Sequence, residues 1–170
     1  MTVTCSAASN GDTGAVGGVT YTKRNASQIT TGNAATSCTS GITDMRSMFK
    51  SETSFNANIG SWDVSSVTDM RTMFREADAF NQSLNSWNVS SVTNMEYMFY
   101  HADVFNGNIG SWNVSSVTEM TAMFNNAAVF NQDISGWCVD DIGSAPDNFD
   151  TGTTAWAGGS ATRPQWGTCP

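Results

Sequence analysis

Hydrophobic and polar positions repeat along the chain with a period of 25 residues. Three consecutive segments, 59–83, 84–108 and 109–133, align without insertion or deletion. Three columns of large apolar residues keep this register: Met45, Met70, Met95 and Met120; Phe49, Phe74, Phe99, Phe124 and Phe149; and Trp62, Trp87, Trp112 and Trp137. A strict period of this length predicts a solenoid, because no single coil can bury its apolar face without a stacked neighbour.

The second half of each repeat predicts a short helix. In one repeat the apolar residues are Met70, Met73, Phe74 and Ala77. This i, i+3, i+4, i+7 spacing gives one apolar stripe along a helix. Thr68 precedes the stripe and is a favourable helix N-cap, and threonine recurs at the same position of the other repeats. We therefore expect each helix to begin just after this threonine.

The first half of each repeat predicts a short strand. Trp62 and Val64 alternate with polar residues, as expected of a strand with one buried face. A Ser-Ser pair follows at 65–66 and predicts a tight turn. Each 25-residue coil is then expected to contain a strand, a turn, a helix and a return loop, which places the chain in the α/β class.

The repeat is similar to known repeat patterns. Its first half, Ile59-x-x-Trp62-x-Val64-x-x-Val67, is similar to the leucine-rich pattern L-x-x-L-x-L-x-x-N. The whole unit, W-D/N-V-S-S-V-T-x-M-x-x-M-F-x-x-A-x-x-F-N, resembles the tandem repeat of BspA-type leucine-rich-repeat surface proteins, a repeat also described from mycoplasma lipoproteins. The resemblance covers about residues 42 to 149. It implies a right-handed solenoid of the leucine-rich type and a secreted or cell-surface protein that acts in recognition or adhesion.

We expect a single domain with three parts. Residues 1–41 form an N-terminal cap, residues 42–142 the repeats, and residues 143–170 a C-terminal cap. The N-terminal cap is expected to contain a small hairpin around Gly17 and Gly18 and a short helix near residues 25–31. One asparagine follows a conserved phenylalanine in each repeat, at Asn56, Asn81, Asn106 and Asn131. These amides are expected to bond the backbone of the adjacent coil.

Four cysteines mark the two ends of the repeat region. Cys38 and Cys138 are four periods apart and occupy the same slot of the first and last coils. Four steps between neighbouring strands span roughly 19 Å, whereas a disulfide tolerates at most about 7 Å between Cα atoms. We therefore expect the disulfides Cys5–Cys38 and Cys138–Cys169, which fasten the caps and favour an oxidising compartment.

Charge changes which partners the chain is expected to bind. Only 13% of its 170 residues are charged and the formal net charge is −8, which argues against nucleic acid or an anionic membrane surface as a partner. No apolar stretch approaches the ~20 residues of a membrane span, so no membrane insertion is expected. The first ten residues lack a basic start followed by an apolar run, so no secretory signal peptide is recognised in them.

The sequence offers few residues for catalysis. His101 is the single histidine, no C-x-x-C pair indicates zinc, and no calcium or phosphate-binding loop motif occurs. His101 is expected to be a solvated residue. The sequence therefore predicts no enzyme, no metal site and no cofactor.

The exposed side of the predicted strands is the candidate binding surface. Three polar residues per coil flank the buried tryptophan and valine: Ser61, Asp63, Ser65, Ser86, Asn88, Ser90, Ser111, Asn113 and Ser115. Ladders of small hydroxyl, amide and carboxylate groups lose little entropy on binding and offer many donors and acceptors. The surface is expected to bind an extracellular glycan, a peptide or protein, or another polymer, unless it is only solvated.

Two alternatives compete with this interpretation. Six basic and five acidic residues occur up to Arg75, but one basic and ten acidic residues occur after it. Such an asymmetry favours self-association end to end, and head-to-tail contacts that do not close produce filaments. Ice binding is the second alternative, because flat arrays of small polar residues can match a lattice, although the threonine column is expected to cap helices.

Overall fold

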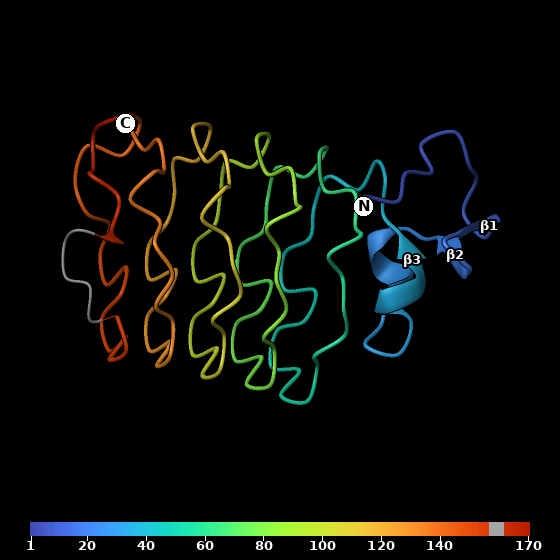
Figure 1. Cartoon of the computed structure of the whole chain (residues 1–170), viewed down its shortest axis with the longest axis horizontal. Coiled ribbons are helices and arrows are strands. Elements are labelled where there is room, and N and C mark those ends of the chain that lie inside the picture. The colour runs from blue at the N-terminus through green and yellow to red at the C-terminus, as the bar shows by residue number, and fades with distance from the viewer. Residues whose placement is uncertain (157–161) are drawn as a thin grey trace.

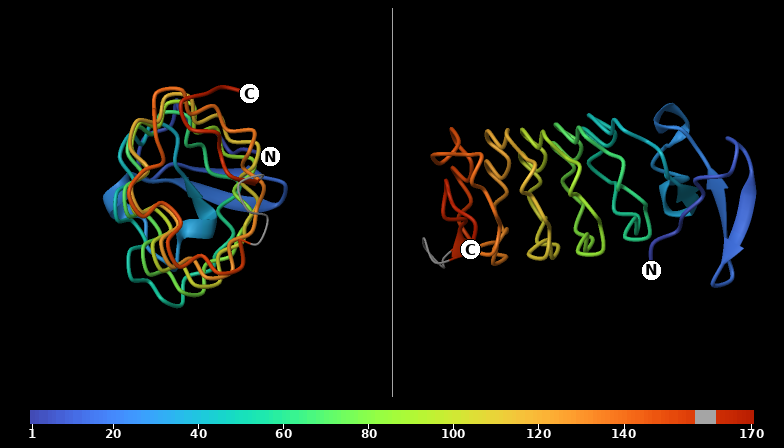
Figure 2. Two further views of the ribbon diagram at one scale, coloured as in Figure 1. Left: turned by 90° about the vertical axis from the view of Figure 1, so that its left-hand side faces the viewer. Right: turned by 90° about the horizontal axis from the view of Figure 1, so that it is seen from above.

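The computed structural model describes residues 1–156 and 162–170, and its repeats form a stack of coils. Successive coils lie side by side along the long axis, with the two ends of the chain at opposite ends of the stack (Figure 1). Seen end-on, the coils nearly superimpose (Figure 2). The methionine, phenylalanine and tryptophan columns are buried inside and form one continuous core. No helix in the described residues is long and apolar enough to cross a membrane.

The predicted α/β class and the strand-turn-helix coil are wrong. The described residues contain no α-helix, and the only sheet has three strands, β1 (Thr13–Val16), β2 (Val19–Lys23) and β3 (Ser37–Cys38). The repeats pair through isolated parallel bridges at Asp44, Asp69, Asn94 and Glu119. Trp62 and Val64, the predicted strand, are buried but lie in irregular chain.

Consecutive turns replace the predicted helix. Thr72 and Glu76 adopt positive φ angles of 56° and 58°, and the same two positions are left-handed in the coils before and after. A left-handed backbone conformation costs about 1–2 kcal/mol at each residue other than glycine. The apolar residues at Met70, Met73, Phe74 and Ala77 are still all buried. Turns that recur every four residues therefore bury side chains at the same i, i+3, i+4 spacing as a helix does.

Backbone hydrogen bonds between coils explain why turns replace the helix. The amide of Thr72 donates to the carbonyl of Glu96 in the next coil at 2.9 Å, and that of Phe74 donates to Met98 at 3.0 Å. The intervening amide of Met73 donates within its own coil, to Met70. Half of the amides thus point along the stack, where an α-helix would direct them to its own carbonyls. The parallel neighbour satisfies these groups in register.

Side-chain ladders reinforce the same junctions. The indole N–H of Trp87 donates to the carbonyl of Ile59, 28 residues earlier, and the other three tryptophans of the column repeat this bond. The asparagine ladder is confirmed, since the amide oxygen of Asn81 accepts from the backbone N–H of Asn106 at 2.8 Å. The hydroxyl of Thr93 donates to the carbonyl of Thr68. The threonine column therefore links coils and does not cap helices.

The caps contain the predicted hairpin and the predicted disulfides. β1 and β2 pair antiparallel across a turn at Gly17 and Gly18, and β2 pairs parallel to β3. The short helix expected near 25–31 is a single 3-10 turn, η1 (Ala26–Gln28), capped by Asn25, and a second turn, η2 (Ala34–Thr36), follows. The disulfides are Cys5–Cys38 and Cys138–Cys169. The first ties the N-terminal segment to β3, which lies next to the first coil.

Candidate functional site

The nine predicted site residues lie on turns and not on strands. In each coil the Asp or Asn side chain accepts hydrogen bonds from the serine two residues later. Asn88, for example, accepts from the backbone N–H of Ser90 at 3.2 Å and from its hydroxyl at 2.8 Å. This Asx turn uses the amide oxygen for local structure. Of the Asn88 and Asn113 side chains only the –NH₂ groups remain to face a ligand, and both residues are exposed.

Asp63 is the most constrained of the nine. Its carboxylate accepts the hydroxyl of Ser40 at 2.6 Å and that of Ser65 at 2.7 Å. Burial by itself raises the pKa of Asp63, but these hydrogen bonds, with the charge of Lys23, outweigh burial and hold the pKa below its usual value. Asp63 therefore links the N-terminal cap to the first coil as a carboxylate and is not a free ligand-binding group.

We predict that Asp63→Asn weakens the pH dependence of stability. A lowered native pKa adds stability above the ordinary pKa of 3.8, and this stability is lost as the pH falls through the native value. The variant should lose about 1 kcal/mol at neutral pH, because a hydrogen bond to a charged acceptor becomes neutral. Urea unfolding at pH 7 and about pH 3 measures the difference. Asp103→Asn, at an exposed carboxylate, is the control; equal pH dependence in both variants would contradict the prediction.

Two of the predicted residues line a groove at the rim of the coils. Ser61 and Ser86 meet the N-terminal cap there, in a groove of about 700 Å³. The lining residues are Met1, Val19, Tyr21, Ala35, Thr36, Asn58, Gly60, Ser61, Ser83, Asn85 and Ser86. The other seven predicted residues do not line it. The structure thus divides the predicted surface into a rim groove and a row of Asx turns.

The rim groove contains polar atoms that remain available. The hydroxyl groups of Ser61 and Ser83 have no hydrogen-bond partner among the described residues. Asn58 and Asn85 use their amide oxygens for the local backbone and for Ser111, which leaves their –NH₂ groups as donors. None of the described residues that line the groove has a charged side chain, and Tyr21 contributes an aromatic ring to the lining. The arrangement suits a neutral ligand rich in hydroxyl groups.

A second groove gathers ionisable residues, of which sequence reasoning singled out only His101 and expected it to be solvated, whereas it is half-buried. The groove measures about 450 Å³ and is lined by Ser51, Thr53, Arg75, Glu76, Asp78, Tyr100, His101 and Asp103. Arg75 pairs with Glu76 at 3.0 Å and stacks over the Tyr100 ring. His101 Nε2 lies 3.0 Å from the amide nitrogen of Asn126. The repeat period could have predicted this groove, because residues 100, 101 and 103 follow residues 75, 76 and 78 by 25 positions. Residues one period apart lie next to each other in adjacent coils. Most of these groups satisfy one another, which leaves less for a ligand.

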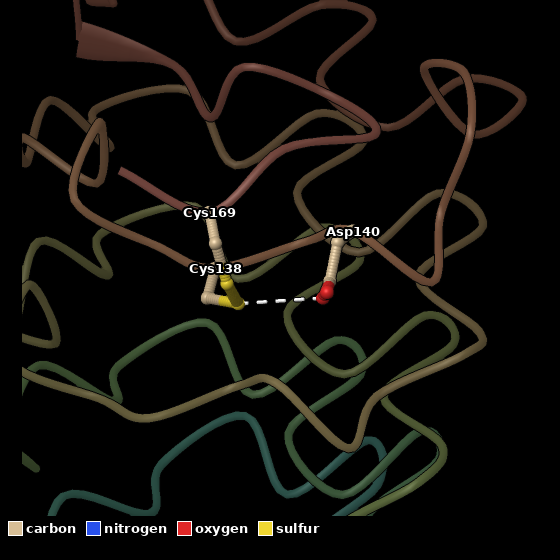
Figure 3. A group of neighbouring side chains, drawn as sticks. All are labelled: Cys138, Asp140 and Cys169. Carbon is tan, nitrogen blue, oxygen red and sulfur yellow. Dashed lines mark hydrogen bonds between the residues drawn. A yellow bond between two sulfur atoms is a disulfide. The ribbon is translucent and has the colours of Figure 1, made fainter.

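Cys138, Asp140 and Cys169 gather near the C-terminal end (Figure 3). An Asp140 carboxylate oxygen lies 3.3 Å from the sulfur of Cys138. Both sulfur atoms belong to the disulfide, so neither is a thiolate that would bind a metal. This cluster is therefore a cross-link beside an exposed carboxylate.

The repeat region matches the model of a known protein family. The family model described as "Mycoplasma protein of unknown function, DUF285" matches residues 19–154. The chain belongs to this family. Membership in the DUF285 family supports the mycoplasma side of the resemblance, a surface-associated repeat protein of unknown function, without extending to the BspA-type leucine-rich repeat. Comparisons with curated proteins and with solved structures give no match.

Proposed function

We propose that this DUF285 protein is a non-enzymatic recognition module, secreted or on the cell surface, that binds a neutral extracellular glycan in the rim groove. The observation that carries the proposal is the lining of that groove. Amide –NH₂ groups of Asn58 and Asn85 and hydroxyl groups of Ser61 and Ser83 surround a cavity of about 700 Å³ without a charged side chain.

The chemistry of a neutral sugar polymer fits these groups. Sugar hydroxyls both donate and accept, so they pair with amides and serine hydroxyls alike. Tyr21 and Val19 line the groove, and their apolar surface suits the apolar side of a pyranose. Anionic polymers are disfavoured, since the groove supplies no cationic side chain to offset their charge.

The location outside the cell is supported by the two disulfides. Both persist only where the environment is oxidising, as it is outside most cells. The coil stack presents mainly small polar side chains, and a rigid scaffold of this kind holds binding groups in place with little entropy to lose on binding. A partner in solution or on another cell would meet such a surface directly.

The test compares three arginine substitutions on an array of neutral oligosaccharides. Ser83→Arg fills the rim groove without removing a side-chain hydrogen bond, and we expect it to reduce binding at least about tenfold, or about 1.4 kcal/mol. Ser66→Arg blocks the neighbouring turns instead, and Val129→Arg adds the same charge at an exposed position outside both surfaces. The last two variants should bind like the wild type.

The array has three other outcomes, and each contradicts part of the proposal. Loss of binding in Ser66→Arg with full binding in Ser83→Arg would move the site from the groove to the Asx turns. Equal loss in all three variants would show that added charge, and not position, decides binding. No binding of any neutral glycan by the wild type would remove the proposed ligand.

A further inference from the structure

At the left-handed positions of the coils and the residue between them, the backbone hydrogen bonds between coils run in one direction. In every junction the amides at the left-handed positions and between them donate to the following coil: Ser47, Phe49 and Ser51; Thr72, Phe74 and Glu76; Tyr97, Phe99 and His101; Ala122, Phe124 and Asn126. Their acceptors are the carbonyls at alternate residues of the next coil, such as Glu96, Met98 and Tyr100 for the second set. Along this column each coil thus presents carbonyls toward the N-terminal end and amides toward the C-terminal end.

The two ends of this ladder are unpaired. At the first coil the carbonyls of Arg46, Met48 and Lys50 occupy the acceptor positions, yet no described residue donates to them. At the last coil the carbonyls of Asp147, Phe149 and Thr151 accept from the preceding coil, which turns the next amides outward. These outward amides, of Asn148, Asp150 and Gly152, have no acceptor among the described residues. One end is therefore an open row of acceptors and the other an open row of donors.

The two rows have the spacing of an internal junction. Asn148 and Gly152 have φ angles of 54° and 81°, the same left-handed pair that Thr72 and Glu76 form within the stack. Three amides at alternate residues therefore face the C-terminal end, and three carbonyls at alternate residues face the N-terminal end. A groove of about 650 Å³ lies between residues 44–48, which include Arg46 and Met48 of the N-terminal row, and the turn of η1.

Charge along one column favours the same contact. The side chains that succeed each other at this position of the coils are Arg46, Arg71, Glu96, Thr121 and Asp147. Within the stack, Arg71 Nη1 lies 3.8 Å from Glu96. Continuing the column from Asp147 to Arg46 of another copy would again bring opposite charges together. Both residues are exposed; Asp147 has no ion pair among the described residues, whereas Arg46 already pairs with Asp44 at 2.6 Å and with Asp69 at 3.5 Å.

We propose that segment 147–152 of one copy docks on residues 46–50 of a second copy and continues the ladder between molecules. Three backbone hydrogen bonds and the pair between Asp147 and Arg46 join each contact. Because donor and acceptor rows lie at opposite ends, the contact is heterologous and does not close on itself, so it propagates into a filament. This self-association does not depend on the rim groove.

Sedimentation velocity over a concentration series, with electron microscopy of the same samples, tests the contact. The wild type should form longer species as its concentration rises, and added salt should shorten them because it screens the pair. Asp147→Arg places two arginines opposite each other, and we expect it to weaken association about a hundredfold. Asp147 has no side-chain interaction in the described structure, so the fold should be unaffected, which far-UV circular dichroism checks.

A charge-swap mixture makes the test specific. Arg46→Glu should also block self-association, but mixing it with Asp147→Arg restores opposite charges at both kinds of contact and should restore filaments. Asp103→Arg makes the same charge change at an exposed position within the stack and should assemble like the wild type. A wild type that stays monomeric at all concentrations and salts would overturn the proposal. So would filaments that survive both single reversals, or a mixture that stays dissociated.

Discussion

Replacing Trp87 with alanine is expected to lower the free energy of unfolding by about 4 kcal/mol, as is usual when a buried aromatic ring is lost. The ring is 3% exposed and stacks nearly parallel between Trp62 and Trp112, with centroids 6.2 and 6.4 Å away. Its loss also removes the indole donor to the carbonyl of Ile59, which then stays buried without that partner. Because a coil contacts only its neighbours, the defect cannot be shared along the stack.

Two further substitutions separate the contributions to this loss. Trp87→Phe keeps a ring in the column but removes the indole N–H, so it should cost about 1–3 kcal/mol, less than alanine does. Val104→Ala shortens a side chain that is 41% exposed and should change stability by less than about 0.5 kcal/mol. Urea unfolding followed by far-UV circular dichroism ranks the three. Equal losses for alanine and phenylalanine would show that the hydrogen bond, and not the ring, stabilises the column.

Removing the Cys5–Cys38 disulfide should cost about 3.5 kcal/mol in the chain-entropy model, since the bond closes a loop with a sequence separation of 33. The double variant Cys5→Ala, Cys38→Ala avoids placing a hydroxyl at Cys38, which is 2% exposed. We expect the loss to be concentrated at the N-terminal cap. There the bond joins the start of the chain to β3, and the Ser40 hydroxyl reaches the Asp63 carboxylate of the first coil.

Hydrogen exchange followed by mass spectrometry measures where this loss falls. In the double variant, peptides from residues 1–41 should exchange faster, while those from residues 84–133 should keep their protection. The variant Cys138→Ala, Cys169→Ala is the matched comparison and should loosen the opposite end. Uniform loss of protection along the whole chain would contradict a stack whose ends open independently.

The period was sufficient to predict which side chains are buried and which cysteines pair. It also predicted the asparagine ladder, because a polar residue at a fixed slot of every coil needs a partner in the next coil. The helix was wrong for a physical reason. Met70, Met73 and Phe74 have the same burial spacing in a four-residue turn as in a helix, and the choice depends on where the amide of Thr72 finds its acceptor. That acceptor, the carbonyl of Glu96, belongs to another coil and leaves no local trace in the sequence.

The candidate site was only partly predictable for a related reason. Alternation at Asp63 and Ser65 predicted outward-facing ladders, but short polar residues also bond their own backbone, and the Asx turn uses the oxygen that a ligand would need. Ser61 and Ser86 do line a groove, but its other wall comes from Val19 and Tyr21 of the N-terminal cap. Which part of the cap faces which part of a coil is set by β3 and the disulfide, and not by the repeat.

The uniformity of the coil junctions has a consequence for the gene. The amide oxygen of Asn56 serves the backbone of Asn81 in the same way that Asn81 serves Asn106, and the tryptophan bonds repeat with the same 28-residue offset. A recombination between neighbouring repeats that removes or adds 25 codons would therefore rejoin equivalent donors and acceptors. Selection can lengthen or shorten the distance between the two capped ends one coil at a time, without redesigning either cap.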